Sequence, residues 1–271
     1  MKIVIPCDFT EVVDFALRHA MRLASVKSSA EYILLHIIDP ASAGKIGGLE
    51  ERQKQLESYA QEKRMELGID IKGLVKEGTI GNAIPEYAEE LRANIIVMGT
   101  HGISGMQKFF GSKAVKVITG SNVPFLAIQS PPISTIPYRE VIMPVGHLPV
   151  ENEKLKWAIS MAQEYGLHFN ILAASFNDPK LNIKVNAKVA LLQRAFDDHG
   201  LAFTLHTGAR GNNIRNEMES LAVKVNADLF LIMITQSMRS VPPFIDTTDQ
   251  NIIANSLGIP VLCLNHSMVL L

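Results

Sequence analysis

The residues best suited to bind a phosphate group lie in one glycine-rich stretch of this sequence, Ile95–Ser121. Glycine lets the backbone approach a phosphate chain closely, and the unpaired amides at a helix N-terminus attract anions. After four apolar residues, the groups with this capacity follow in the order Gly99, Gly102, Gly111, Ser112 and Lys113. We therefore expect a buried strand, a phosphate-binding loop and a helix. The competing interpretation is an ordinary strand–loop–helix connection in which Ser112 only caps the helix.

A second candidate group follows the first predicted strand, Lys2–Pro6. Asp8 would lie at the carboxyl end of this strand, where the ligands of open α/β sheets bind. Its carboxylate is equally suited to cap the helix that starts after it, and the two roles are compatible. Cys7 stands beside this acid, and a neighbouring carboxylate raises the pKa of a thiol. We therefore interpret Cys7 as a small buried residue and not as a reactive thiol.

Other kinds of chemistry are not indicated. The loop lacks the P-loop signature, because five residues separate Gly105 from Gly111 and the order that follows is Gly-Ser-Lys. The eight histidines, of which His101 lies in the glycine-rich loop, show no His-x-x-x-His spacing, so we predict no metal site built by the protein itself. No nucleophile elbow or Ser/His/Asp arrangement is visible. We expect no enzymatic turnover, or slow turnover at most.

Apolar runs alternate with amphipathic segments through the first half of the chain. The runs predict strands, and the segments with apolar residues at helical spacing predict helices. The predicted strands are Lys2–Pro6, Glu31–Ile38, Ile69–Lys76, Ile95–Met98 and Pro124–Gln129, and the predicted helices reach Ala24, cover Leu49–Leu67 and Asn82–Arg92, and start at Ser112. This order predicts an α/β fold, an open five-stranded parallel sheet with helices on both faces.

The pattern restarts after a linker, Ser130–Pro137, which contains three prolines and two serines. Four elements of the two halves answer each other in the same order: IVIP and VIMP, GTIGNAI and GARGNNI, Ala-Asn and Ala-Asp, and VPFLAI and IPVLCL. Matches that keep their order along the chain indicate an internal duplication. We predict two tandem domains of one fold, residues 1–133 and residues 134–271.

Composition limits the class of protein. The chain has 271 residues, of which 47% are hydrophobic and 20% are charged, and its formal net charge is -1. This supports two apolar cores and gives no electrostatic footprint for nucleic acid. Two cysteines make no disulfide framework, the first apolar run is too short for a signal sequence, and no stretch approaches the ~20 apolar residues that cross a bilayer. We expect a soluble cytoplasmic protein that binds neither nucleic acid nor a membrane.

The first half resembles the universal stress protein family. The matching residues are Pro6-Cys7-Asp8-Phe9-Thr10, Leu35-His36-Ile37-Ile38-Asp39, Met98-Gly99-Thr100-His101-Gly102 and Gly111-Ser112. In outline the whole chain is similar to tandem, two-domain UspA-like members, whose fold is Rossmann-like and resembles that of the adenine nucleotide alpha hydrolases. Nucleotide-binding members carry nine residues between the second glycine and the Gly-Ser pair, whereas eight separate Gly102 from Gly111 here.

The resemblance implies a stress-response protein that binds ATP or AMP, with Mg²⁺ only as the companion of the nucleotide. The acid contacts the adenosine part in the family, apolar strand residues flank the adenine, and the glycine loop with Gly-Ser holds the phosphates and the ribose. The implied contacts are Pro6, Cys7, Asp8, Phe9, Thr10, Ile37, Ile38, Met98, Gly99, Thr100, His101, Gly102, Gly111, Ser112 and Lys113.

Two alternatives stay open. The first is an interaction or scaffold protein that keeps the fold and has lost the ligand, and the loop that is one residue shorter than the family pattern favours it. The second is an enzyme of a related nucleotide α-hydrolase-like fold, which would need a base and a substrate site that the sequence does not show.

The second half departs from the family pattern at each corresponding point. Gly146 or His147 takes the place of Asp8, and a glycine-free stretch, Thr235–Leu257, replaces the glycine loop. Its two prolines offer no amide proton, and its two acids repel a phosphate. We predict a structural half that binds no nucleotide. Because family members pair through their last strands, we expect an internal pseudo-dimer, a monomer or homodimer in solution, and a protein partner that the sequence does not name.

Overall fold

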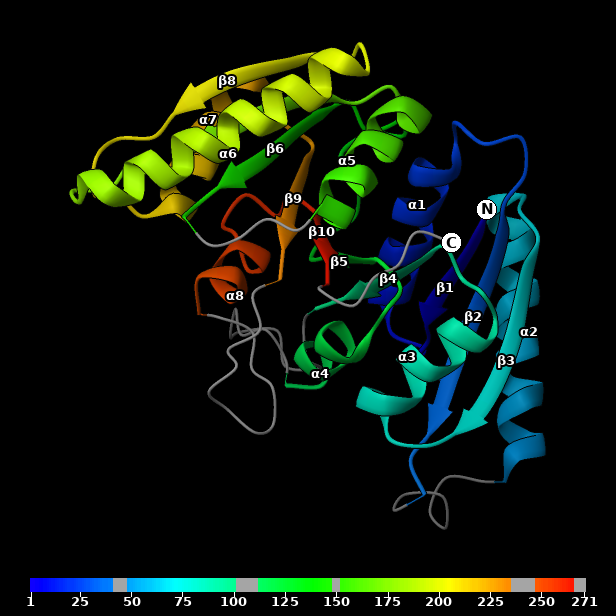
Figure 1. Ribbon diagram of the computed structural model, residues 1–271. Helices are drawn as coiled ribbons and strands as arrows, with labels where there is room; N and C mark the ends of the chain where they lie inside the picture. The colour runs from blue at the N-terminus through cyan, green and yellow to red at the C-terminus, as the bar shows by residue number, and fades with distance from the viewer. Residues whose placement is uncertain (41–47, 101–111, 148–151, 235–246, 266–271) are drawn as a thin grey trace.

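The computed structural model describes residues 1–40, 48–100, 112–147, 152–234 and 247–265. In these ranges the chain forms one ten-stranded sheet with helices on both faces (Figure 1). The strands are β1 (Lys2–Pro6), β2 (Glu31–Ile38), β3 (Ile71–Glu77), β4 (Ile95–Gly99), β5 (Phe125–Ile128), β6 (Glu140–Val145), β7 (His168–Ala173), β8 (Phe203–Thr207), β9 (Leu229–Met233) and β10 (Val261–Leu264). The helices are α1 (Glu11–Ala24), α2 (Leu49–Leu67), α3 (Ile80–Glu90), α4 (Ser112–Gly120), α5 (Asn152–Tyr165), α6 (Pro179–Asp198), α7 (Ile214–Val225) and α8 (Thr247–Ile253).

The strand order is β3-β2-β1-β4-β5-β10-β9-β6-β7-β8. Strand pairs are parallel within β1–β5, the first half, and within β6–β10, the second half. The halves join where β5 pairs antiparallel with β10, with Cys263 opposite Phe125. The predicted α/β fold with two five-stranded parallel units is confirmed, and the last strands of the two units pair inside one chain.

The second glycine of the GxxGN repeat, Gly81 in the first half and Gly211 in the second, has a different structural role in each half. Helix α3 begins at Ile80, two residues before the predicted start at Asn82, so Gly81 lies inside the helix. A Cβ atom at Gly81 would be 2.8 Å from Cβ of Lys116, so the glycine lets α3 approach α4 closely. Gly211 instead precedes α7 and has a φ of +74°, which favours glycine. The matched glycines are therefore needed for different reasons, close helix packing at Gly81 and a positive φ at Gly211.

Another part of the repeat is structurally equivalent in the two halves. The side chain of Asn94, just before β4, accepts a hydrogen bond from the amide of Lys2 (2.7 Å). The carboxylate of Asp228, just before β9, accepts one from the amide of Arg139 (3.2 Å). Each side chain thus ties the amino end of the first strand of its half to the neighbouring strand.

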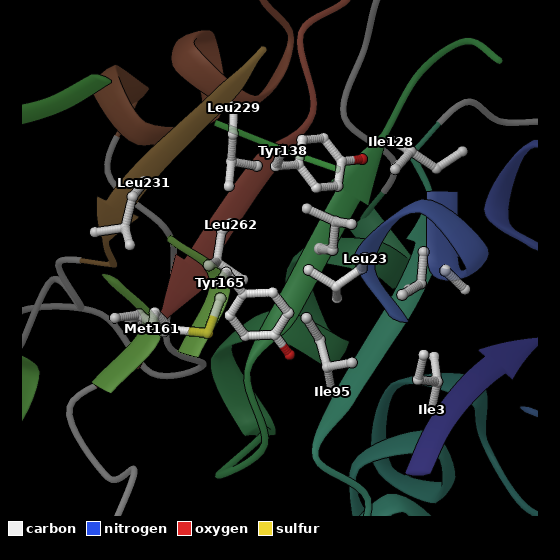
Figure 2. Packing of buried hydrophobic residues seen from close by; sticks show 14 of the residues in the cluster. Ile3, Leu23, Ile95, Ile128, Tyr138, Met161, Tyr165, Leu229, Leu231 and Leu262 are labelled. Carbon is white, nitrogen blue, oxygen red and sulfur yellow. The ribbon is translucent and has the colours of Figure 1, made fainter. Parts of the chain in front are cut away.

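Two apolar layers hold the helices on the sheet. Helices α1, α2, α5 and α6 pack on one layer, and α3, α4, α7 and α8 pack on the other. Alternate strand residues supply the two layers, because successive side chains of a strand point to opposite faces. The layer under α1 and α5 continues across the junction, where Leu23 and Ile95 belong to the same buried cluster as Met161 and Tyr165 (Figure 2).

A buried polar network also joins the halves, and we call its members, His19, Arg22, Tyr138 and Asp228, the Arg22 network. Arg22 of α1 donates to the Asp228 carboxylate (2.6 Å) and to a carbonyl of the linker. Its guanidinium carbon lies 4.0 Å from the centre of the Tyr138 ring. The Tyr138 hydroxyl is 2.6 Å from Nδ1 of His19, and Nε2 of His19 is 2.9 Å from the carbonyl oxygen of Ser130. The network fixes the linker between α1 and the second half.

Candidate functional site

The strand order reverses direction at β1. The chain passes from β1 to β2 and β3 on one side, and then crosses to β4 on the other side of β1. Open parallel sheets bind ligands outside the carboxyl ends of their strands at such a switch point. Asp8 follows β1 here, and Gly99 ends the neighbouring β4. The topology therefore brings two of the predicted segments to one edge of the sheet.

The carboxylate of Asp8 organises the turn between β1 and α1. Asp8 is exposed, and its Oδ1 accepts hydrogen bonds from the amide (3.1 Å) and the hydroxyl (2.6 Å) of Thr10. The residue at the N-cap of α1 is Thr10, whose side chain makes no capping bond. Asp8 therefore stabilises the turn that leads into the helix, and the N-cap position expected for Asp8 is occupied by Thr10.

Phe9 anchors this turn through its side chain, which packs on the layer under α1 and α2. It has a φ of +64°, a conformation that costs energy for a residue with a Cβ atom. Its ring packs 4.9 Å from that of His36 and edge-on at 5.7 Å from that of Tyr59, in the layer under α1 and α2. The hydroxyl of Tyr59 in α2 donates to the carboxylate of Asp14 in α1 (2.8 Å), a contact between helices that no local motif predicts.

Cys7 is buried, as interpreted from the sequence. Its amide donates to the Leu35 carbonyl (2.9 Å), and its own carbonyl accepts from Nδ1 of His36 (2.7 Å), which therefore carries the proton. Burial, with smaller contributions from the carboxylates of Asp8 and Asp14 and against a hydrogen bond from the backbone of Phe9, raises the pKa of the thiol to about 12. The thiol is neutral at physiological pH and supports the strand end.

Gly99 and Thr100 both stabilise the end of β4. A Cβ atom at Gly99 would lie 1.9 Å from Cγ1 of Val12, so only glycine lets the first turn of α1 pack on the strand. Thr100 is buried, and its amide (3.0 Å) and hydroxyl (3.3 Å) both donate to the carbonyl of Ile128 in β5. Glycine is thus required at position 99 for the packing of α1 on the strand. The glycine pattern of the sequence alone could not distinguish this requirement from phosphate binding.

Replacing Gly99 with alanine should lower the free energy of unfolding by about 1–3 kcal/mol, because the new methyl group overlaps Val12. The double variant Gly99→Ala/Val12→Ala should regain part of this loss, since it removes the overlapping methyl groups of valine. Gly146→Ala is the control, because a Cβ atom there meets nothing within 4 Å. Denaturant unfolding measures all three. Equal stabilities of Gly99→Ala and the control would contradict the packing role.

The predicted apolar contacts divide between the two faces of the sheet. Ile37 and Met98 pack in the layer under α3 and α4, whereas Ile38 packs in the layer under α1 and α2. Pro6 pairs in register with a β2 residue of the α3/α4 layer and shares that face. Pro6, Ile37 and Met98 therefore form one apolar surface across three neighbouring strands, whereas Ile38, the other predicted apolar contact of β2, lies on the opposite face because adjacent strand residues alternate.

The same face carries a cation that the sequence analysis missed. Lys76 of β3 is in register with Ile37, and its ammonium nitrogen lies 4.6 Å from the centre of the Tyr87 ring in α3. This contact holds a positive charge near the carboxyl edge of the sheet. The sequence offered only a lysine near a strand end, which is equally typical of a solvated strand.

The remaining predicted contacts are placed only in part. His101, Gly102 and Gly111 lie outside the described residues. Ser112 and Lys113 are the first two residues of α4. Since a helix that connects two parallel strands runs back along them, the N-terminus of α4 lies at the edge where β1 and β4 end.

The corresponding edge of the second half has the same backbone hydrogen bond as the first half, but its described part lacks the candidate binding side chains. The amide of Ile234 after β9 donates to the carbonyl of Leu264 (2.8 Å), as Thr100 does in the first half. Gly146 is exposed, and its carbonyl accepts from Lys188 (3.0 Å). Residues 235–246 of the glycine-free stretch lie outside the described residues. No carboxylate takes the place of Asp8 in the described part of this edge.

Among the residues that the structure describes, no three histidine, cysteine, aspartate or glutamate side chains gather closely enough to hold a metal ion. None of the described helices is long and apolar enough to span a membrane.

Comparisons with known proteins agree with this architecture. The sequence model of the universal stress protein family matches residues 1–129. Universal stress protein MJ0531 of Methanocaldococcus jannaschii is 33% identical over 141 residues, which are 48% of this chain and 82% of that protein. Universal stress protein MJ0577 of the same organism is 28% identical over 153 residues, 47% of this chain and 94% of that protein.

A solved structure matches nearly the whole chain. The crystal structure of a universal stress protein from Archaeoglobus fulgidus superposes with a TM-score of 0.74, at 17% identity, over 97% of this chain and 96% of that one. The fold of both halves together is thus that of a tandem protein of this class. The chain belongs to the universal stress protein family, as its motifs indicated.

Proposed function

We propose that residues 1–133 bind an adenine nucleotide, ATP or AMP, at the carboxyl ends of β1 and β4, and that the protein serves the stress response without catalysis. One observation carries the proposal. The Asp8 turn and the glycine-rich loop leave the sheet from neighbouring strands on the two sides of its switch point. Ligands of open α/β sheets bind at this position.

The described residues suit the adenosine part of such a ligand. The Asp8 carboxylate uses Oδ1 for Thr10, and a carboxylate accepts more than two hydrogen bonds, so ribose or adenine donors can be accommodated. Pro6, Ile37 and Met98 offer an apolar surface for the base. Phe9 and Cys7 lie behind this surface. Phe9 packs in the layer under α1 and α2, and the backbone of Cys7 holds the end of β1 through its hydrogen bonds to β2.

The phosphates in this proposal lie toward the N-terminus of α4. The amides of Gly102, Gly111 and Ser112 would bind the phosphate oxygens, and Lys113 would add a cation there. Mg²⁺ enters only with the nucleotide, since phosphate oxygens and water supply most of its ligands. No base for hydrolysis is assigned, so the nucleotide acts as a bound signal.

Residues 134–271 act as the structural partner of the nucleotide-binding half in this proposal. The antiparallel pairing of β5 with β10 and the Arg22 network hold the two halves together. An occupied site is then presented on a rigid ten-stranded sheet, from which a protein partner in the cytoplasm can detect it.

The competing function is that of a nucleotide-independent interaction protein. The structural roles of Gly99 and Thr100 favour this competing function, because the fold requires these residues whether or not a ligand binds. The shorter loop between Gly102 and Gly111 favours it as well.

Isothermal titration calorimetry with ATP and with AMP separates the two functions. The wild-type protein should release or absorb heat on binding, and Gly102→Val should bind at least tenfold more weakly, because a branched side chain blocks the approach of the phosphates. Gly146→Val, at the corresponding edge of the second half, is the matched control and should bind like the wild type. No binding by the wild type would support the interaction protein, and equal binding by Gly102→Val would place the site elsewhere.

A further inference from the structure

The two outermost strands of the sheet, β3 and β8, occupy equivalent positions in the two halves (Figure 1). Each of them pairs with the second strand of its half, and Pro6 and Pro144 mark equivalent points on the two first strands. Counting outward from these prolines matches each residue of β3 with a residue of β8. The matched pairs include Ile71 and Phe203, Gly73 and Leu205, and Val75 and Thr207.

The outer edge of β3 is closed by side chains of α2. Successive residues of a strand direct their backbone groups to opposite sides, and Ile71, Gly73 and Val75 direct theirs away from β2. Arg64 donates to the carbonyl of Ile71 (2.7 Å). The side-chain amide of Gln53 donates to the carbonyl of Gly73 (3.1 Å) and accepts from the amide of Val75 (3.2 Å). The outward backbone groups of this edge strand therefore have partners within the chain.

The outer edge of β8 is open. The carbonyl of Ala202 and the amide of Gly208 form hydrogen bonds to β7, so the residues at odd positions between them direct their backbone groups outward. These residues are Phe203, Leu205 and Thr207. Within the described ranges, no hydrogen bond reaches their outward N–H and C=O groups. The strand therefore presents a row of backbone donors and acceptors to the outside.

Two features that protect the edge of β3 are missing from β8. A Cβ atom at Gly73 would lie 3.0 Å from Cγ of Leu56, so glycine lets α2 approach the edge closely, whereas the matching residue of β8 is Leu205 with 40% of its surface exposed. Strand β3 also carries Lys72 and Lys76, and β8 contains no charged residue. Lysine on an edge strand discourages pairing with another chain. The edge of β8 lacks this protection.

We propose that β8 pairs antiparallel with β8 of a second copy of this chain, around a two-fold axis at Leu205. Leu205 of one copy then lies opposite Leu205 of the other, and Phe203 lies opposite Thr207. Each outward-directed residue meets another outward-directed residue, and two such residues exchange two hydrogen bonds in an antiparallel pair. The pairing therefore satisfies the whole open edge and joins two ten-stranded sheets into one.

A second copy suits this edge because the charges at its two ends are complementary. Asp197 and Asp198 are exposed at the end of α6, just before the strand, and Arg210 is exposed just after it. Antiparallel pairing brings the acidic end of each copy to the basic end of the other, whereas parallel pairing would bring like charges together. The interface uses no residue of the proposed nucleotide site, so it is independent of that proposal.

Sedimentation equilibrium tests this pairing. The wild-type chain should form a dimer in equilibrium with the monomer at up to about 1 mM protein. Leu205→Lys should raise the dissociation constant at least tenfold, because like charges directly opposite each other destabilise a strand pair. Val223→Lys is the control, since Val223 is an exposed apolar residue of α7, outside β8. A monomeric wild type, or a dimer that Leu205→Lys leaves unchanged, would overturn the proposal.

Mixing two oppositely charged variants tests the position of the two-fold axis. Leu205→Lys and Leu205→Glu should each dimerise weakly, because each places like charges on the axis. In an equimolar mixture the charges attract, so a heterodimer should form with a dissociation constant at least tenfold lower than that of either variant alone. Thermal unfolding verifies that both variants are folded. A mixture that associates no better than its components would contradict the pairing of Leu205 with its own counterpart.

Discussion

Replacing Arg22 with methionine is expected to lower the free energy of unfolding by about 3–5 kcal/mol, the cost of leaving one member of a buried ion pair unpaired. The Arg22 side chain is 5% exposed, and it donates to the Asp228 carboxylate at 2.6 Å. It also covers the ring of Tyr138. Methionine keeps much of the apolar length and removes the charge, so Asp228 remains in place with the backbone amide of Arg139 as its hydrogen-bond donor.

Arg18→Met is the matched control for this experiment. Arg18 lies one turn earlier on α1 and makes an ion pair of similar length with Glu66 (2.7 Å), but its side chain is 48% exposed. An exposed pair contributes about 0–1 kcal/mol. Denaturant unfolding of both variants gives the comparison. A loss for Arg22→Met as small as that for Arg18→Met would show that the Arg22 network does not hold the halves together.

Acidification is expected to remove about 3 kcal/mol of stability through His19. Burial, with a smaller contribution from Arg22 and against an opposing hydrogen bond to the Ser130 carbonyl, lowers the pKa of His19 from 6.5 to about 4. The neutral ring suits its partners, since Nε2–H donates to the Ser130 carbonyl and Nδ1 accepts from the Tyr138 hydroxyl. A protonated Nδ1 would meet that hydroxyl as a second donor, close to the Arg22 cation.

The direction of the pH effect follows from these two pKa values. The unfolded chain binds a proton at His19 near pH 6.5, whereas the folded chain binds it only near pH 4. The contribution is complete above pH 6.5 and is lost as the pH falls toward 4. Burial raises the pKa of Asp228, which acts in the opposite direction. Unfolding of wild type and of His19→Gln at several pH values isolates the histidine, and equal slopes in the two proteins would contradict this account.

The order of strands and helices could be predicted from the sequence because it depends on local patterns. Apolar runs, helical spacing and turn residues each act over a few positions, and the duplication supplied a second copy of the evidence. The Arg22 network could not be predicted in this way. Arg22 and Asp228 are 206 residues apart, and they meet only when the two five-stranded halves of the sheet pair through β5 and β10.

The candidate site shows where local patterns are ambiguous. A glycine at the end of a strand fits both a phosphate and a close helix, and only the position of Val12 reveals that Gly99 serves the helix. The division of Ile37 and Ile38 between the two faces, by contrast, follows from the alternation of side chains along a strand and was available in the sequence. Lys76 and Tyr59 gave no local signal, because their partners lie on other elements.

The stoichiometry of nucleotide binding tests the central proposal most directly. The first half keeps the Asp8 turn and the glycine-rich loop, whereas the second half has Gly146 and a glycine-free stretch at the same edge. Titration of the wild-type chain with ATP in a calorimeter is therefore expected to give one bound nucleotide per chain, with binding weakened at least tenfold by Gly102→Val. Two nucleotides per chain, or none, would contradict the assignment of a single site at the ends of β1 and β4.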